Sequence, residues 1–458
     1  MKLTVIGGGG VRAPFMIAGL VHYAPRIDLQ EVWLMDTDAE KLALIGRLCR
    51  HLAEKHAAPF SLHCTTDARA ALRDAEHVIT TIRVGGEAGR VKDERVALRH
   101  GVIGQETTGA GGFAMAMRTV PAILEYCALR AQVAPGAWLY NFTNPAGLVV
   151  QALTEAGERR VIGICDSANG AQHEVARHLG VPGDRVRTEV FGLNHLSWTR
   201  SAVVDGEDRL PLLLEDPAFV RATPLRLFDA ALIGRLGMYL NEYLHYYYYR
   251  DEALAALQAE EETRGEQVQR LNGALIDLLR NTDDPEKALE IHHGIMSERS
   301  STYMAHAGAH GAASGEAAPP GGAAPESVEA EDSGGYAGVA LSCVEAICSG
   351  KPHRTALNVP NQGAIAGMRD DDVVEVTCIV DAEGPHPQPI GDTPEHQYLL
   401  MRQVKRYERL AAEAILKRDR LLAVAALFEH PLVGSYSLAE ALVDDYLDAH
   451  REHVGAWR

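Results

Sequence analysis

The fold of the first third of the chain is decided by its opening stretch, Leu3-Thr4-Val5-Ile6-Gly7-Gly8-Gly9-Gly10-Val11-Arg12-Ala13. The apolar run Leu3–Ile6 predicts a buried strand, and this strand leads directly into four glycines. The register Gly8-x-Gly10-x-x-Ala13 matches the dinucleotide-binding fingerprint, with alanine in its last place. Glycines let a backbone approach a pyrophosphate, and the N-terminus of the next helix offers amides and a favourable dipole.

A second strand, predicted over Glu31–Met35, is followed at once by Asp36. An acid at this place can bond the ribose 2′-hydroxyl and favours NAD over NADP. A flexible glycine turn is the alternative interpretation of the opening, but strand, glycines, helix and acid arrive here in the order that a nucleotide site needs. The candidate NAD-binding residues are Gly8, Gly10, Val11, Arg12 and Asp36.

Strands and helices go on alternating up to about residue 165. Because short apolar strands alternate with helical patterns, we expect a Rossmann-like, doubly wound parallel sheet of the α/β class in residues 1–165. Further strands are predicted over His77–Ile82, Trp138–Asn141 and Arg160–Ile164, and helices over Ala39–Lys55 and Val120–Ala134.

The remainder, residues 166–458, mixes helical and strand patterns and predicts a second, α+β domain for catalysis, substrate binding and oligomerisation. Residues 307–335 consist mainly of Ala, Gly, Pro, Ser and Glu and predict a flexible insert, since they cannot bury enough surface to offset their ordering entropy. Helices are predicted over Leu232–Tyr249, Gly265–Asn281 and, as one long or two abutting helices, His396–Leu427, and a strand over Val373–Asp381.

The bulk composition restricts the class of partner. A chain of 458 residues with 47% hydrophobic and 23% charged residues is typical of a soluble protein with two domains. A net charge of −18 disfavours nucleic acid and anionic membranes as partners, so an anionic substrate would need a local basic pocket. We find no apolar run of 18 residues and no signal peptide, and the seven scattered cysteines favour a reduced, cytoplasmic protein.

Several downstream motifs fit no ordinary dehydrogenase. In their order and spacing they resemble glycoside hydrolase family 4, and the resemblance runs from residue 1 to about residue 445. The segments that carry it are Ile82-Arg83-Val84-Gly85-Gly86, Gly104-Gln105-Glu106-Thr107-Thr108-Gly109, Thr143-Asn144-Pro145, Gly163-Ile164-Cys165-Asp166, Gly192-Leu193-Asn194-His195-Leu196 and Glu429-His430-Pro431-Leu432.

This resemblance implies a fold like that of lactate and malate dehydrogenases, and the use of NAD⁺ with a divalent metal, usually Mn²⁺. It implies a redox-elimination route, in which sugar C3 is oxidised, C2 is deprotonated, the aglycone leaves, water adds and C3 is reduced again. The family is an exception to hydrolysis by two carboxylates. The stretch Gly101–Gly112 is most similar to 6-phospho-β-glucosidases, and we expect a homodimer or homotetramer.

The resemblance also implies roles for single residues. Cys165 and His195 match the two protein ligands of the metal. Ligand softness alone favours zinc, iron or cobalt beside a thiolate, whereas the family implies manganese. Taken alone, Cys165 reads as a buried core thiol and His195 as a hydrogen-bonded loop histidine.

Three residues match catalytic positions of the family. Tyr243 is the candidate base, because it lies 21 residues before Arg264, which is close to the spacing in the family. Four more tyrosines follow at 246–249. Glu106 matches a position that orients and polarises this tyrosine. Asp166 matches a general acid of some members, and its alternative is a capping or supporting carboxylate.

Arg90, Arg264 and Asn144 match substrate-binding positions. A guanidinium suits bidentate recognition of phosphate, although most arginines form surface ion pairs. Arg299 stands where many β-type relatives have Arg-Gly-Gly.

Four other interpretations stay open. Asp166 is similar to the 6-phospho-α-glucosidase branch, and the residues after it, Ser167-Ala168-Asn169, depart from the usual phosphoglucosidase pattern. A non-phosphorylated glycoside is a further possible substrate. A plain NAD-dependent sugar or 2-hydroxyacid dehydrogenase would instead release NADH. A catalytically inactive nucleotide sensor would have no use for Cys165, His195, Tyr243 or Glu106.

Overall fold

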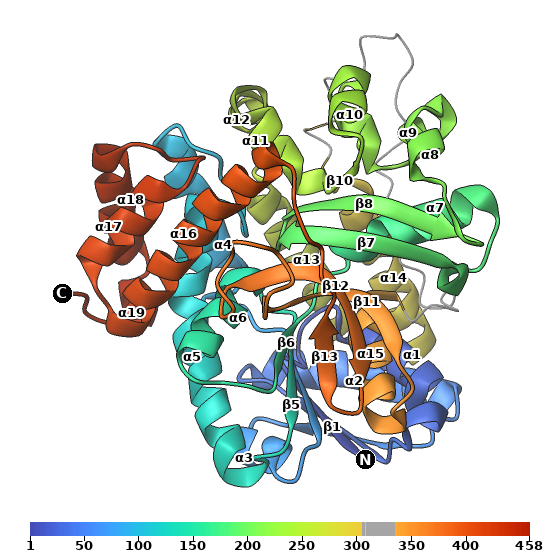
Figure 1. Ribbon diagram of the computed structural model, residues 1–458. Helices are drawn as coiled ribbons and strands as arrows, with labels where there is room; N and C mark the ends of the chain where they lie inside the picture. Colours follow the sequence, from blue (N-terminus) through green and yellow to red (C-terminus); the bar gives the residue numbers. More distant parts are fainter. Residues whose placement is uncertain (305–306, 308–334) are drawn as a thin grey trace.

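The protein is built around a nine-stranded sheet, as a computed structural model shows (Figure 1). The structure describes residues 1–304, 307 and 335–458. The flexible insert expected at 307–335 lies outside the described residues, except for its two end positions. The strands follow the order β13-β12-β11-β6-β5-β4-β1-β2-β3 across the sheet.

Six of these strands form the doubly wound half that the sequence predicts. All five pairings among them are parallel, and their spatial order 3-2-1-4-5-6 is that of a dinucleotide-binding sheet. The expected α/β fold is therefore confirmed. The bounds are β1 (Lys2–Ile6), β2 (Glu31–Met35), β3 (Ser61–Thr65), β4 (His77–Thr80), β5 (Trp138–Asn141) and β6 (Val161–Gly163).

Three antiparallel strands from the second half extend the same sheet. Strand β11 pairs with β6 through Asn358 and Gly163, and β12 and β13 continue outward. A separate antiparallel sheet packs beside them. The boundary predicted near residue 165 stays a prediction. The bounds are β11 (His353–Pro360), β12 (Val373–Asp381) and β13 (Gly384–Pro387), and in the second sheet β7 (Val186–Leu193), β8 (Leu196–Val204), β9 (Glu207–Asp208) and β10 (Tyr239–Leu240).

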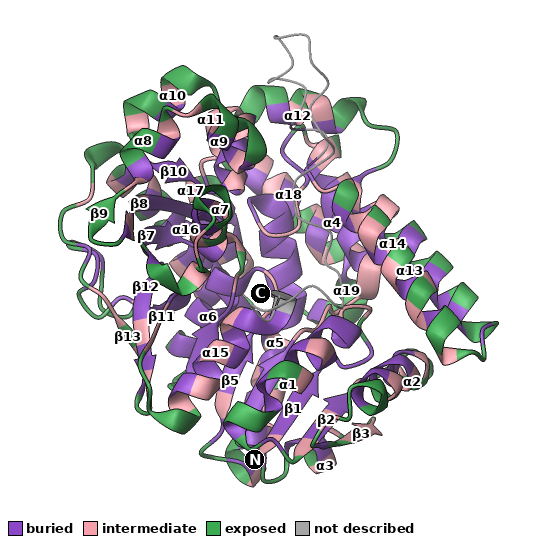
Figure 2. Ribbon diagram, turned by 90° about the vertical axis from the view of Figure 1, so that its right-hand side faces the viewer, coloured by how far each residue is buried: buried purple, intermediate pink, exposed green. Residues whose placement is uncertain are grey.

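Helices cover both faces of the large sheet, and their inward sides are buried (Figure 2). On one face α1 (Ala13–Ile27) packs against α2 (Ala39–Lys55) and α15 (Gly335–Ser349). On the other, α5 (Ala110–Val133) and α6 (Ala146–Glu155) carry the C-terminal helix α16 (Glu395–Lys417). The C-terminal helices form the red group in Figure 1. They are α16, α17 (Arg420–Glu429), α18 (Tyr436–Ala449) and α19 (Arg451–Val454).

The other α-helices lie around the sheets. They are α3 (Ala68–Leu72), α4 (Gly86–Arg99), α7 (Gly170–Leu179), α8 (Leu210–Leu214), α9 (Pro217–Ala222), α10 (Ala230–Leu236), α11 (His245–Tyr248), α12 (Arg250–Ala259), α13 (Arg264–Arg280) and α14 (Pro285–Ser301).

The single helix predicted over Leu232–Tyr249 is wrong. Gly237 takes a left-handed φ of 61° and ends α10, and Tyr239–Leu240 then pairs with β8 as a short strand. The side chain of Asn241 accepts a hydrogen bond from the Tyr243 amide and starts a 3₁₀ turn. The apolar periodicity was compatible with a helix, but strand pairing prevailed over it. This break in the helix places Tyr243 in the candidate active site.

Two other helix predictions need adjustment at their ends. Helix α5 begins ten residues before the predicted Val120, since two early glycines weaken the helical pattern while fitting closely against a loop. The stretch His396–Leu427 forms two helices, because Arg418 adopts a left-handed conformation between α16 and α17.

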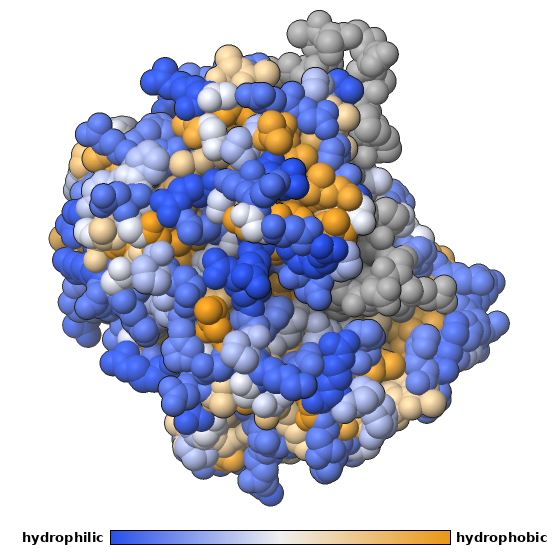
Figure 3. All heavy atoms as spheres, turned by 45° about the vertical axis from the view of Figure 1, so that its right-hand side comes forward, coloured by the Kyte–Doolittle hydropathy of each residue, from blue (hydrophilic) through white to orange (hydrophobic). Residues whose placement is uncertain are grey.

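Hydrophilic side chains cover most of the face shown in Figure 3, with apolar side chains scattered among them. All seven cysteines are free thiols. In the part of the chain that the structure describes, no helix has the length and apolar character needed to cross a membrane.

Candidate active site

A cleft of about 1210 Å³ opens at the carboxyl ends of the parallel strands. Ligands of doubly wound sheets bind at this edge, because the strand-to-helix loops converge there. The loops that follow β1, β2, β4, β5 and β6 all line the cleft. Segments far apart in sequence therefore meet in one place.

The glycine loop is shaped by close backbone contacts. A Cβ added to Gly7, whose φ is 98°, would lie 2.3 Å from the carbonyl oxygen of Thr81. One added to Gly8 would lie 2.7 Å from the Leu34 Cβ, so Gly8 serves packing against β2 and does not line the cleft. Gly10, Val11 and Arg12 do line it.

Asp36 reaches back to the glycine loop. One of its carboxylate oxygens accepts the Gly9 amide at 2.9 Å, and the other accepts the Asp38 amide at 3.0 Å. A carboxylate has about four acceptor positions, so it can bond a ribose hydroxyl as well. Asp36 lines the cleft, where the sequence placed it.

Cys165 and His195 lie side by side, although 30 residues separate them in sequence. The Cys165 Sγ is 3.4 Å from the His195 Nε2. Cys165 follows β6, and His195 occupies the two-residue turn between β7 and β8 with a left-handed φ of 60°. A non-glycine residue in this region is strained, and such strain gathers at functional sites.

Hydrogen bonds fix the tautomer of His195. The Thr107 hydroxyl donates to the Gln105 Oε1 at 2.8 Å, so its oxygen accepts from the His195 Nδ1 at 2.7 Å. The proton therefore sits on Nδ1, and the lone pair of Nε2 points toward Cys165. Burial lowers the pKa of His195 to about 4, which keeps the ring neutral at physiological pH. Metal-binding histidines are held in this way.

The Tyr243 ring stacks on the His195 ring. Their centroids are 3.7 Å apart and the planes differ by 2°. Burial, with the nearby Glu242 carboxylate, raises the pKa of Tyr243 well above its usual value, and a hydrogen bond with Tyr303 opposes this shift. Among the neighbouring tyrosines, Tyr246 also lines the cleft. The other three pack elsewhere, against His430, Trp198 and Asp229.

Glu106 is held by two arginines. Its Oε2 is 2.7 Å from the Arg83 Nη1 and 3.0 Å from the Arg90 Nη1. Burial works to raise the pKa of Glu106, but the two guanidiniums outweigh it and hold the pKa well below its usual range. Its negative charge raises the pKa of Tyr243. In this structure Glu106 therefore opposes ionisation of the tyrosine that it was expected to polarise.

Arg264 and Arg299 lie in the same part of the cleft, and both donate hydrogen bonds to uncharged acceptors. Arg264 donates to Gln267, Thr302 and the carbonyl of Arg299. Burial and the charge of Arg90 lower the pKa of Arg264. Burial and the charge of Arg12 lower that of Arg299 to about 9. Nearby carboxylates, Glu106 for Arg264 and Glu87 for Arg299, compensate this positive charge only in part.

Asn144 and Asp166 also line the cleft, and Asp166 is exposed. Behind them, the Asn194 amide ties the histidine turn to the core. It accepts from the Gly147 amide at 3.4 Å and donates to Glu375 at 3.3 Å. Burial raises the pKa of Glu375 to about 7.

Sequence reasoning missed several residues of this site. Thr107, Asn194 and Arg83 stood inside quoted motifs but received no role. Glu375 is a charged residue between valines in β12, which is a signal for a buried polar contact. Tyr303 carried no such signal.

The donor set at Cys165 and His195 fits a divalent cation with an open coordination sphere. No group of three or more His, Cys, Asp or Glu side chains placed to hold a metal occurs among the described residues. Two protein ligands leave several positions for water and substrate hydroxyls, as Lewis-acid catalysis requires. Burial raises the pKa of the Cys165 thiol well above its usual value. Metal binding would displace the thiol proton.

Two family models match the chain almost end to end. The model "Family 4 glycosyl hydrolase" matches residues 2–181, and "Family 4 glycosyl hydrolase C-terminal domain" matches residues 190–433. A probable 6-phospho-β-glucosidase of Bacillus subtilis is 33% identical, covering 99% of this chain and 97% of its own. The 6-phospho-β-glucosidase of Escherichia coli is 30% identical, covering 99% and 96%.

Solved structures agree. The 6-phospho-β-glucosidase of Thermotoga maritima, determined with manganese, NAD⁺ and glucose-6-phosphate, has a TM-score of 0.81 at 27% identity, over 99% of both chains. A 6-phospho-α-glucosidase from gut microorganisms, with NAD and glucose-6-phosphate, also scores 0.81, at 25% identity over 100% and 99% of the chains. A malate dehydrogenase of Plasmodium falciparum scores 0.51 at 13% identity, over 91% and 100%, which shows a shared fold alone.

Proposed function

The chain belongs to family 4 of the glycosyl hydrolases, and from this premise we propose that it hydrolyses 6-phospho-β-glucosides with NAD⁺ and a divalent metal, Mn²⁺. The matched relatives that are 30% identical or more act on 6-phospho-β-glucosides by name. The sequence motif over Gly101–Gly112 indicates the same branch.

One observation carries the phosphate assignment. Arg264 and Arg299 are held near each other in the cleft, each with a lowered pKa and neutral acceptors as hydrogen-bond partners. An anionic phosphate would compensate this charge by charge-assisted hydrogen bonds. A neutral glucoside would leave it uncompensated. This is the local basic pocket that a chain with a net charge of −18 needs for an anionic substrate.

The residues of the cleft suit both cofactors. Bound NAD⁺ accepts a hydride from the sugar and returns it, and a bound metal polarises substrate oxygens. Gly10, Val11 and Arg12 would border the pyrophosphate and Asp36 the ribose. Cys165 and His195 would hold the metal, with Thr107 keeping the Nε2 lone pair available.

We assign Tyr243 as the base that takes the proton from C2. The neutral phenol of the structure needs help to ionise, because burial and Glu242 raise its pKa. A divalent cation next to the stacked His195 would favour the ionised phenolate and so lower the pKa of Tyr243. Asp166, exposed on the cleft wall, is the candidate proton donor to the leaving oxygen, and Asn144 a candidate hydrogen-bond partner of the sugar.

The phosphate assignment is tested with Arg264→Ala on paired aryl β-glucosides, with and without the 6-phosphate. Loss of a charge-assisted contact costs about 1.5–3 kcal/mol, so kcat/KM for the phosphorylated substrate should fall about 10- to 150-fold. The unphosphorylated substrate should lose far less. Arg280→Ala, an exposed arginine paired with Glu40, is the matched control. Equal losses on both substrates would contradict the assignment.

The anomer and the redox balance are tested in the same assay. The β-linked phosphorylated substrate should be cleaved faster than its α-linked counterpart; the reverse would favour the α branch, whose solved structure matches equally well. NAD⁺ should be required without net consumption. Accumulation of NADH in step with product would indicate a plain dehydrogenase.

A further inference from the structure

A second cysteine–histidine pair lies at the other end of the sheet, where the function proposed above gives it no role. The Cys348 Sγ is 3.4 Å from the His77 Nε2, the same separation as in the cleft pair. His77 is the first residue of β4, and Cys348 stands in the last turn of α15. The pair therefore lies at the amino ends of the strands, away from the cleft at their carboxyl ends.

A third soft donor completes this cluster. The Cys348 Sγ is 3.6 Å from the Met1 Sδ. In a tetrahedral site with metal–sulfur bonds of about 2.3 Å and metal–nitrogen bonds of about 2.0 Å, a sulfur and a nitrogen lie about 3.5 Å apart and two sulfurs about 3.8 Å apart. The observed separations are within about 0.2 Å of these values. Only a small movement of the Met1 side chain would be needed.

The Nε2 of His77 faces the sulfur, and the Tyr140 hydroxyl lies 3.0 Å from the Nδ1 on the other side of the ring. The phenol oxygen can accept the ring proton on Nδ1 when Nε2 binds a cation. Burial lowers the pKa of His77 to about 4, so the ring is neutral. His77 is 3% exposed, whereas Cys348 is exposed, so an ion can reach the cluster from solvent while the imidazole is held rigidly behind it.

We propose that Cys348, His77 and Met1 form a binding site for a soft monovalent cation, Cu⁺, which is separate from the metal site of the cleft. A thiolate and a thioether select Cu⁺ over harder ions, and an imidazole is compatible with it. Binding exchanges the thiol proton for the ion and releases that proton to solvent, with no change of oxidation state. Carboxylate-preferring Mn²⁺ has little affinity for this donor set.

The site is tested by anaerobic competition for Cu⁺ against a chromophoric chelator. All proteins carry Cys165→Ser, which removes the thiolate of the cleft. This parent should bind one equivalent of Cu⁺, and copper X-ray absorption should show sulfur and nitrogen neighbours together. Cys348→Ser and His77→Gln should each weaken binding at least 10-fold. Cys64→Ser, the other partly accessible thiol, is the matched control and should bind like the parent.

Three outcomes would overturn the proposal. They are undiminished Cu⁺ binding by Cys348→Ser, an equal loss in Cys64→Ser, and a preference of the parent protein for Zn²⁺ over Cu⁺. His77→Gln alters a buried residue, so circular dichroism must show native structure before its affinity counts. Cys348 is exposed at a helix end, and its replacement in the chain that retains Cys165 should leave the fold and the Mn²⁺-dependent turnover unchanged.

Discussion

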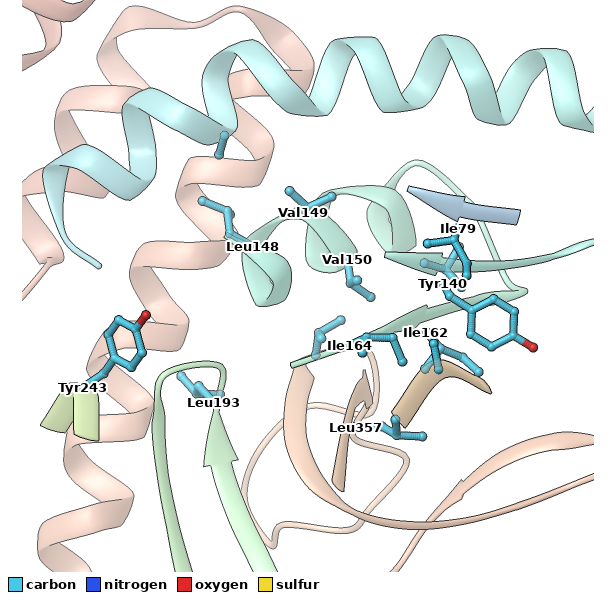
Figure 4. Packing of buried hydrophobic residues seen from close by; sticks show 14 of the residues in the cluster. Ile79, Tyr140, Leu148, Val149, Val150, Ile162, Ile164, Leu193, Tyr243 and Leu357 are labelled. Carbon is cyan, nitrogen blue, oxygen red and sulfur yellow. The ribbon is translucent and has the colours of Figure 1, made fainter. Parts of the chain in front are cut away.

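Two cysteine–histidine pairs with the same 3.4 Å separation stand at opposite ends of one parallel sheet. In both, a hydroxyl, from Thr107 or Tyr140, lies beside the Nδ1, and the Nε2 faces sulfur. Figure 4 shows two tyrosines that mark these ends: Tyr243 and Tyr140 lie on opposite sides of the labelled core residues. The donors alone therefore do not determine what each pair does.

The surroundings differ, and they assign the functions. Cys165 and His195 face a cleft of about 1210 Å³ that also contains Tyr243 and buried arginines, with room for a sugar phosphate and a dinucleotide. Cys348 and His77 face a thioether and the surface. The cleft pair has open coordination positions for substrate, while the second pair has its third donor in place. The lesson is that the carboxyl ends of the strands, where loops converge, supply the reactive partners.

The largest expected contrast comes from removing each thiol. Cys165→Ser should leave no measurable turnover, because the Lewis acid is worth several kcal/mol of charge stabilisation. Cys348→Ser should keep wild-type kcat/KM. Both are measured with saturating NAD⁺ and Mn²⁺. Comparable losses in the two variants would erase the distinction between the ends of the sheet.

The next contrast concerns the two tyrosines. Tyr243→Phe keeps the ring stacked on His195 but removes the phenolic oxygen, so kcat should fall about 10²- to 10⁴-fold. NAD binding should persist. Tyr140→Phe, which removes only the hydroxyl beside His77, is the matched control and should retain turnover. An active Tyr243→Phe enzyme would move the base elsewhere, with Tyr246 the nearest alternative in the cleft.

A smaller effect is expected at the residue that fixes the cleft histidine. Thr107→Val removes the acceptor for the His195 Nδ1 proton, and loss of such a support typically weakens metal affinity about 10- to 100-fold. Thr107→Ser retains the hydroxyl and should restore the affinity for Mn²⁺, measured by titration of free Mn²⁺. Failure of the serine variant to restore it would show that Thr107 acts through packing.

The contrast with the smallest expected effect on turnover concerns a buried histidine outside both pairs, and it is measured as the free energy of unfolding. Burial lowers the pKa of His430, which belongs to neither pair, to about 3. A histidine whose pKa is lowered in the folded state makes its full contribution to stability at pH values above its unfolded-state pKa of about 6.5. This contribution declines as the pH falls toward 3. His430→Gln should therefore lose less unfolding free energy on acidification, by up to about 1.4 kcal/mol per pH unit. Parallel denaturation curves at pH 7 and pH 4 measure the difference.

Much of the fold could be predicted from short-range patterns. The bounds of β2, β5, β12 and α2 match the predicted ranges residue for residue, because strand length, caps and turn residues are local signals. The region around Tyr243 could not be predicted in this way. Gly237 and the pairing of Tyr239–Leu240 with β8 break the helical pattern, and a partner strand 40 residues away leaves no local mark.

The predicted site residues were gathered into one cleft, with Gly8 the exception, since it packs against β2. Their mutual arrangement was not predictable. Glu106 bonds arginines, and the tautomer of His195 depends on Thr107, which a list of motifs does not reveal. Hydrogen-bond partners in the core depend on side-chain geometry, which sequence spacing does not define.

The central claim, that the cleft cleaves glycosides by elimination, is tested most directly by running the wild-type reaction in D₂O with a 6-phospho-β-glucoside, NAD⁺ and Mn²⁺. If Tyr243 removes the C2 proton before the aglycone leaves, the sugar product carries deuterium at C2, detected by NMR or mass spectrometry. Hydrolysis by two carboxylates never breaks that bond. A product with only hydrogen at C2 would contradict the account.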